Sequence, residues 1–121
     1  PATMRGVNKA FIMATGHAVG TPDDLDWHSL ARTNQPIVVY MGLKNLPRIV
    51  AALLEGGLPS TTPAAVIASA TTASKRIVTG TLATIHDDAT KAKLEAPAII
   101  VIGNIMAMRD ALLSLPGDPN A

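Results

Sequence analysis

The 121-residue chain contains no cysteine, so it has no disulfide, no thiolate metal ligand and no cysteine nucleophile. This absence fits a reducing compartment, and we expect the cytoplasm. Aromatic residues are almost as scarce, because Phe11, Trp27 and Tyr40 are the only three. Hydrophobic residues still make up 48% of the chain, so the core must consist of aliphatic side chains and alanine.

Neither sign of charge is in clear excess. Lysine and arginine number 10 against 9 acidic residues, and the net charge of +1 gives no reason to expect a nucleic acid or an anionic membrane as partner. The longest apolar stretch, AIIVIGNIMAM, is interrupted by Gly103 and Asn104 and is too short to span a bilayer. The first residues also lack the pattern of a signal peptide. We therefore expect no membrane partner.

Five short segments have the composition of strands. Four are apolar runs bounded by turn residues, which is typical of strands buried on both faces. The fifth mixes threonine with Ile, Val and Leu around Gly80, which predicts a half-exposed strand with a bulge. A short TTAS link joins this strand to the preceding one and predicts a hairpin, hence a mixed sheet. The five predicted strands are residues 9–14, 36–41, 63–68, 75–85 and 97–102.

Helical periodicity is clearest in residues 46–54, where Leu46, Ile49 and Leu53 fall on one face together with Val50 and Leu54. A proline in the first turn and the pair Gly56–Gly57 mark the ends of this helix. Shorter helices are predicted within residues 21–32, 87–96 and 104–113, and residues 114–121 are expected to fray. The chain therefore predicts one α/β domain, residues 1–121, with a mixed sheet of about five strands flanked by helices.

Self-sufficient catalytic motifs are absent: the sequence has no G-x-G-x-x-G, G-x-x-x-x-G-K-[ST], G-x-S-x-G or H-E-x-x-H. The run His86-Asp87-Asp88 is a weak metal candidate, and we favour Asp87 or Asp88 as a helix N-cap. His17 follows a strand and a glycine, where it is either a general base or a turn histidine that bonds to the backbone. We favour the turn role because no carboxylate is paired with it. We therefore predict no catalytic residue and no metal ligand.

Small residues follow two of the predicted strands, in YMGL (residues 40–43) and SATT (residues 69–72). Ligands of α/β folds collect beyond the carboxyl ends of strands, and both segments fall there. Small residues at such ends let a flat ring lie close to the main chain, or they simply allow tight packing of strand and helix. The spacing alone does not separate the two interpretations.

Several segments in succession resemble one family, the tetrapyrrole methylases that use S-adenosylmethionine, and within it the C-terminal domain of the uroporphyrinogen-III C-methyltransferases. The resemblance covers nearly the whole chain. Two positions depart from the family pattern, because Met4 replaces a usual histidine and Lys75 a common glutamine. The segments that carry the resemblance are PATMRG, TGH followed by LDW, YMGL, SATT, RIVTGTL and PAIIVIGNIMAMRDAL.

This resemblance implies that the chain is the C-terminal half of a two-domain enzyme whose N-terminal domain is absent. It implies S-adenosylmethionine as cofactor, with Met41, Ala70 and Ala98 on the cofactor side of the interdomain cleft. Thr3 and Arg5 would line the cleft toward a tetrapyrrole substrate. It also implies a homodimer, and an isolated chain that is inactive because the acid and base belong to the other domain.

The function implied by the resemblance is transfer of two methyl groups to C-2 and C-7 of uroporphyrinogen III, giving precorrin-2 for sirohaem or cobalamin. In-line positioning and exclusion of water can supply much of the acceleration of such a transfer. Two alternatives remain open: another precorrin methylase of the same fold, and a half-domain that serves only in binding or dimerisation.

Overall fold

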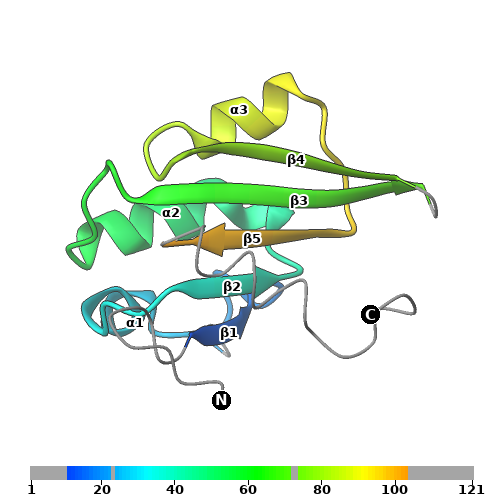
Figure 1. Ribbon diagram of the computed structural model, residues 1–121. Helices are drawn as coiled ribbons and strands as arrows, with labels where there is room; N and C mark the ends of the chain where they lie inside the picture. The colour runs from blue at the N-terminus through cyan, green and yellow to red at the C-terminus, as the bar shows by residue number, and fades with distance from the viewer. Residues whose placement is uncertain (1–10, 23, 72–73, 104–121) are drawn as a thin grey trace, which may run out of the picture.

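The computed structural model describes residues 11–22, 24–71 and 74–103. They form a five-stranded mixed sheet with the strand order β1-β2-β5-β3-β4 (Figure 1). The strands are β1 (Ile12–Thr15), β2 (Ile37–Tyr40), β3 (Pro63–Thr71), β4 (Ser74–Thr81) and β5 (Ala98–Ile102). The predicted α/β fold with a mixed sheet and flanking helices is confirmed.

Strand directions place three carboxyl ends at one edge of the sheet. β1 runs parallel to β2, whereas β5 is antiparallel to both β2 and β3. The strands β1, β2 and β3 therefore share one direction and end at the same edge, where β5 begins. β3 and β4 form the predicted antiparallel hairpin. The edge at which β1, β2 and β3 end is called the carboxyl edge below.

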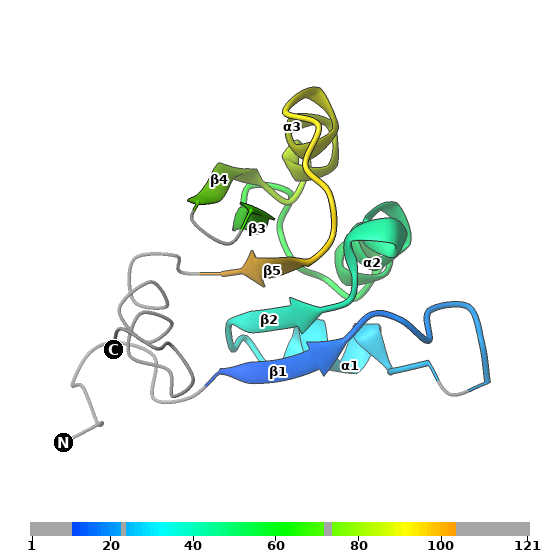
Figure 2. The ribbon, with the colours of Figure 1, turned by 90° about the vertical axis from the view of Figure 1, so that its right-hand side faces the viewer.

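The helices within the described residues pack on one face of the sheet. They are α1 (Trp27–Arg32), α2 (Leu46–Glu55) and α3 (Ile85–Lys91), and a short 3-10 turn, η1 (Leu43–Asn45), leads into α2. Figure 2 views the sheet from its side and shows α2 and α3 on the same side of it. Buried side chains of all three helices, such as Trp27, Ile49 and Ile85, share one core cluster with alternate residues of the strands.

The opposite face of the sheet carries a smaller cluster. Its centre is one cross-strand row, Val38, Val101 and Ala65, and all three side chains are buried. At the outer strands this face is open: Met13 on β1 is 53% exposed and Ile77 on β4 is 57% exposed. The prediction of strands buried on both faces therefore holds for the three central strands and is wrong for β1.

Helix α2 follows the predicted pattern closely. Leu46, Ile49 and Leu53 are fully buried, and the predicted proline lies in the first turn. Gly56 caps the helix, and Gly57 adopts a φ of 111°, a conformation that favours glycine. The 3.6-residue periodicity identified this helix because Leu46, Ile49 and Leu53 belong to the core, whereas Leu54 of the predicted stripe is 36% exposed.

Two local predictions are wrong. The irregularity of the hairpin lies between Ser69 and Thr71 in β3, and not at Gly80, where the register is continuous. Gly80 instead lies under α3, since an added Cβ there would contact the side chains of Asp88 and Thr84. The N-cap of α3 is Thr84, and Asp87 and Asp88 lie within the first turn. The predicted helix 104–113 and the tail 114–121 lie outside the described residues.

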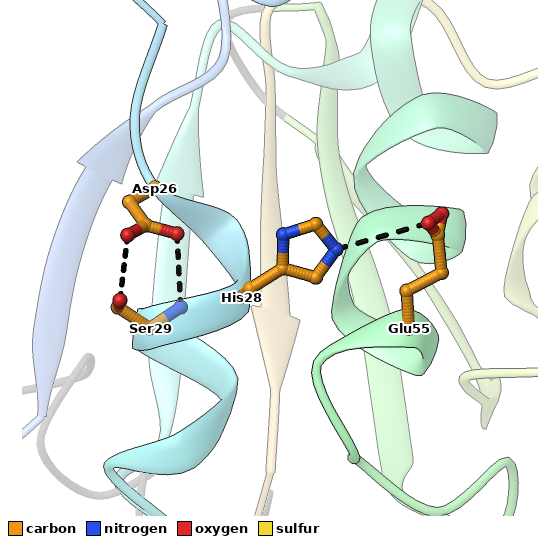
Figure 3. Close-up of polar contacts among 4 residues, drawn as sticks. All are labelled: Asp26, His28, Ser29 and Glu55. Carbon is orange, nitrogen blue, oxygen red and sulfur yellow. Dashed lines mark hydrogen bonds and ion pairs between the residues drawn. The ribbon is translucent and has the colours of Figure 1, made fainter.

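A carboxylate organises the start of α1. Asp26 accepts hydrogen bonds from the amide of Ser29 at 3.1 Å and from its hydroxyl at 2.6 Å, the geometry of an N-cap. These hydrogen bonds lower the pKa of Asp26. Figure 3 shows the cap, and it also shows His28 of α1 pointing toward Glu55 of α2, at 3.7 Å between Nε2 and Oε2. Both side chains of this ion pair are largely exposed, so it contributes little to stability.

A second carboxylate fixes the loop between β1 and α1. Asp24 accepts hydrogen bonds from the indole N–H of Trp27 at 2.9 Å and from the amides of Gly20 and Leu25 at 3.1 and 2.7 Å. Partial desolvation acts to raise the pKa of Asp24, but the three hydrogen bonds together lower it. The indole is thereby satisfied although Trp27 is buried, which explains why the chain tolerates its one tryptophan in the core.

Candidate functional site

A half-open cavity of about 740 Å³ lies at the carboxyl edge. This volume falls within the range of ligand sites, about 300–1,000 Å³. Its walls come from the end of β2, the end of β3 and the start of β5, together with the segments next to them. The lining residues are Tyr40, Met41, Leu43, Lys44, Ile67, Ala68, Ala96, Pro97, Ala98 and Ile99. We call this cavity the carboxyl-edge cavity.

Two of the predicted cofactor residues line this one cavity, although 57 positions separate them in the sequence. Met41 follows directly on Tyr40, whose cross-strand partner is Ile99, and Ala98 precedes Ile99 on β5. The structure therefore brings Met41 and Ala98 to the same wall. The peptide bond between Ala96 and Pro97 just before this wall is cis.

Met41 has an unusual backbone for a residue with a side chain. Its φ is 53°, in the left-handed region, and its side chain is 63% exposed. Residues held in this region cluster at binding and active sites, where the surrounding structure enforces them. The next residue, Gly42, is buried.

Gly42 is required for close packing. An added Cβ there would lie 2.7 Å from Cγ1 of Val39 and 3.1 Å from Cδ1 of Ile49. Gly16, at the end of β1, approaches even closer, because its added Cβ would lie 2.6 Å from the Cα of Gly42. The amide of Gly16 donates to the carbonyl of Tyr40, and its own carbonyl accepts from the side chain of Asn45. The glycine in YMGL thus serves packing, and the turn beside it lines the carboxyl-edge cavity.

Ala68 is a lining residue that the sequence reasoning missed. It is 2% exposed and pairs directly with Ala98 across β3 and β5. The pair Ala68–Ala98 forms a floor without bulky side chains, on which a flat ring can approach the main chain. The sequence carried no signal that separates a binding role of Ala68 from plain packing in an apolar strand.

The three other predicted site residues are Ala70, Thr3 and Arg5. Ala70 lies on β3, within the stretch where the register shifts between Ser69 and Thr71, two residues beyond Ala68. Thr3 and Arg5 lie outside the described residues. A second, smaller cavity of about 480 Å³ lies at the opposite edge of the sheet and contains none of the predicted residues.

Each of the three histidine side chains has one polar partner among the described residues. His17 Nδ1 lies 2.8 Å from the hydroxyl of Thr15, so its partner in the turn is a side chain and not the predicted backbone group. His86 Nδ1 lies 3.8 Å from Asp87, the next residue on α3. Among residues 11–22, 24–71 and 74–103, no three His, Asp or Glu side chains come together as metal ligands. In the same part of the chain, no helix has the length and apolar character needed to cross a membrane.

Sequence comparison finds relatives among biosynthetic enzymes. The chain is 40% identical over 112 residues to the sirohaem synthase of Thiobacillus denitrificans and 41% identical over 113 residues to that of Methylococcus capsulatus. Each match covers 93% of this chain. The chain spans only 23% and 24%, respectively, of the length of those relatives.

Structural comparison finds the same fold in solved methyltransferases. Uroporphyrin III C-methyltransferase from Thermus thermophilus matches with a TM-score of 0.69 at 26% identity, over 89% of this chain and 46% of that one. The same enzyme complexed with S-adenosylhomocysteine matches with a TM-score of 0.65 at 27% identity, over 89% of this chain and 48% of that one. Cobalt precorrin-4 methyltransferase matches with a TM-score of 0.74 at 18% identity, over 89% of this chain and 45% of that one, a likeness of fold alone.

A family profile covers most of the chain as well. The profile described as Tetrapyrrole (Corrin/Porphyrin) Methylases matches residues 1–86, a span that includes β1, β2, β3, β4 and the predicted site residues up to Ala70. The predicted resemblance is confirmed: the chain belongs to the tetrapyrrole methylase family.

Proposed function

We propose that this chain is the C-terminal half of a two-domain methyltransferase that binds S-adenosylmethionine and methylates uroporphyrinogen III at C-2 and C-7. The product would be precorrin-2, the precursor of sirohaem and of cobalamin. The observation that carries the proposal is the carboxyl-edge cavity, where Met41 and Ala98 meet. The names of the sequence relatives and the solved Thermus enzyme support the choice of reaction.

The residues of the carboxyl-edge cavity fit a bound adenosine. The Ala68–Ala98 floor leaves room for a flat ring against the strands, and Ile67 and Ile99, from the other face of the same strands, make the rest of the lining apolar as well. The left-handed turn at Met41 lies at the wall where β2 ends. S-adenosylmethionine would supply a methyl group from its sulfonium, and the neutral thioether that remains, S-adenosylhomocysteine, is a good leaving group.

The task of these residues is binding, orientation and exclusion of water. Holding two reactants in line removes a large part of the barrier to a displacement without any acid or base on this domain. Apolar walls keep water from the reacting centre. The proposal assigns no acid or base to this domain, and the side chains that pair with the three histidines, Thr15, Glu55 and Asp87, do not line the carboxyl-edge cavity.

A second domain is part of the proposal. The solved Thermus chains are about twice as long as the region matched here, because the match covers 46% to 48% of them. A cavity that is half-open in this chain would be closed by that domain, which would also supply the acid and base. Ala70, Thr3 and Arg5 stay proposed contacts of the cofactor or the cleft, and a cytoplasmic homodimer is the proposed state.

The substitution Ala98→Leu tests where the cofactor binds. The added isobutyl group would fill the floor of the carboxyl-edge cavity, and such overpacking costs about 1–3 kcal/mol, or roughly tenfold to a hundredfold in affinity. Affinity for S-adenosylhomocysteine is measured by titration calorimetry on the full-length gene product that carries this sequence. Ala51→Leu is the matched control, since Ala51 is exposed on α2 and does not line the cavity. Equal affinity of the two variants would remove Ala98 from the cofactor site.

A further inference from the structure

The carboxyl-edge cavity has an uneven distribution of charge. Nine of its ten lining residues carry no ionisable group that is charged at neutral pH, and the tenth is Lys44, in η1. Lys44 is exposed. Within the described part of the chain it has no hydrogen bond or ion pair, because the two ion pairs there are His28–Glu55 and His86–Asp87. An unneutralised ammonium therefore lies on the wall of an otherwise apolar cavity.

A second cation continues the floor of the carboxyl-edge cavity toward β4. Ala98 pairs with Ala68, and Ala68 pairs in turn with Arg76, so the three residues form one cross-strand row. Side chains in such a row lie on the same face of the sheet, with Cβ atoms about 5 Å apart between neighbours. Arg76 is exposed, and its guanidinium forms no ion pair among residues 11–22, 24–71 and 74–103.

The distance between the two cations restricts what they can bind together. In the strand order, β2, which leads to Lys44, and β4, which carries Arg76, are separated by β5 and β3. Three strand spacings amount to roughly 14 Å. A single carboxylate would contact both cations only if both side chains extended toward each other across the sheet. A broad ligand with several carboxylates around its rim can contact each cation where it lies, and it would lie across the open side of the cavity, above the alanine floor that the proposed function gives to the adenosine.

We propose that Lys44 and Arg76 bind carboxylate side chains of the tetrapyrrole substrate on opposite sides of the carboxyl-edge cavity. This assignment rests on the proposed function, because it takes the polyacid ligand to be the methyl acceptor. Lys44 contacts one acidic chain as a compact charge, whereas Arg76 offers a planar pair of donors that suits a carboxylate. Neither residue takes part in the chemistry, so both act as positioning residues.

The test uses the full-length gene product and the variants Lys44→Gln, Arg76→Gln and the double variant. Each loss of an exposed charge contact is expected to raise the KM for uroporphyrinogen III about threefold, and the double variant about tenfold, with kcat nearly unchanged. Arg32→Gln is the matched control, because Arg32 is an exposed cation at the end of α1, near the opposite edge where β2 begins. Lys44→Arg is expected to keep the wild-type KM.

Binding measurements with two cofactor analogues distinguish the carboxylates of the substrate from that of the cofactor. Affinities for S-adenosylhomocysteine, which has a carboxylate, and for methylthioadenosine, which has none, are measured for the wild type and the double variant. The proposal predicts no change for either ligand. A loss of affinity for S-adenosylhomocysteine alone would assign these cations to the cofactor and overturn the proposal, and so would an unchanged KM in the double variant.

The two cations can also be tested if the proposed methyl transfer itself is wrong. If the wild type transfers no methyl group, the proposed reaction is wrong, and binding of the octacarboxylate uroporphyrin III, followed by fluorescence, still tests the two cations. The proposal then predicts about tenfold weaker binding by the double variant than by Arg32→Gln. Equal binding by these two variants would overturn it. Unchanged melting temperatures of all variants would exclude misfolding as the cause.

Discussion

The substitution Gly16→Ala tests how the packing of two strand ends supports the candidate site. The added Cβ would lie 2.6 Å from the Cα of Gly42 and 3.0 Å from Cδ1 of Ile49. The first of these neighbours is backbone and cannot rotate away. The turn formed by Met41 and Gly42, which lies at the wall of the carboxyl-edge cavity, would therefore have to move.

Two effects of opposite sign determine the size of the change. Overpacking typically costs about 1–3 kcal/mol. Replacing glycine by alanine recovers about 0.4–1 kcal/mol through the unfolded state, because the backbone of Gly16 does not have a positive φ. The net loss is about 0–2.6 kcal/mol. For a 121-residue chain each kcal/mol corresponds to roughly 4 °C, so the melting temperature should fall by up to about 10 °C.

Calorimetric unfolding together with titration of S-adenosylhomocysteine measures both consequences. Gly57→Ala is the control, because an added Cβ there meets nothing within 4 Å while the φ of 111° makes alanine strained. Both variants should melt earlier, but only Gly16→Ala should also bind the ligand more weakly. A Gly16→Ala variant with unchanged melting temperature and unchanged affinity would refute the argument that the two strand ends hold the site.

Two further predictions concern the N-cap and the isolated domain. The folded pKa of Asp26 is lowered from its ordinary 3.8, so the stability that its carboxylate contributes is present above that pH and is lost as the pH falls through the lowered pKa. The variant Asp26→Asn should therefore melt earlier than wild type at pH 7 and lose less stability on acidification. Melting temperatures of the two proteins that fall in parallel from pH 7 to pH 2 would contradict this. The 121-residue chain alone should bind S-adenosylhomocysteine with a dissociation constant toward the millimolar range, because a half-open cavity buries less of the ligand surface than a closed site does. Micromolar binding in a calorimetric titration would mean that the site is complete without a second domain.

Much of the fold was predictable because local patterns and tertiary packing agree. The apolar stripe of α2 and the short apolar runs of the strands satisfy both their own periodicity and the sheet that they build. The bulge of the hairpin and the cap of α3 were not predictable in the same way. Gly80 looked like a bulge, but the requirement for glycine comes from Asp88 on α3, a contact that is made only in the folded chain.

The candidate site was predictable only in part. Met41 and Ala98 came from resemblance, and the strand directions then explain why they meet at the carboxyl edge. Ala68 carried no signal of its own, since an alanine in an apolar strand is equally suited to plain packing. Lys44 and Arg76 belong to no motif in the sequence that points to a ligand, and only the register of β3, β4 and β5 relates Arg76 to the alanine floor.

The most direct test of the account is methyl transfer by the full-length gene product that carries this sequence. Uroporphyrinogen III is incubated with S-adenosylmethionine labelled in its methyl group, and the products are separated and identified by mass spectrometry. The account predicts a product that carries two labelled methyl groups, at C-2 and C-7. Absence of label from the tetrapyrrole, or methylation only of a later precorrin, would contradict it.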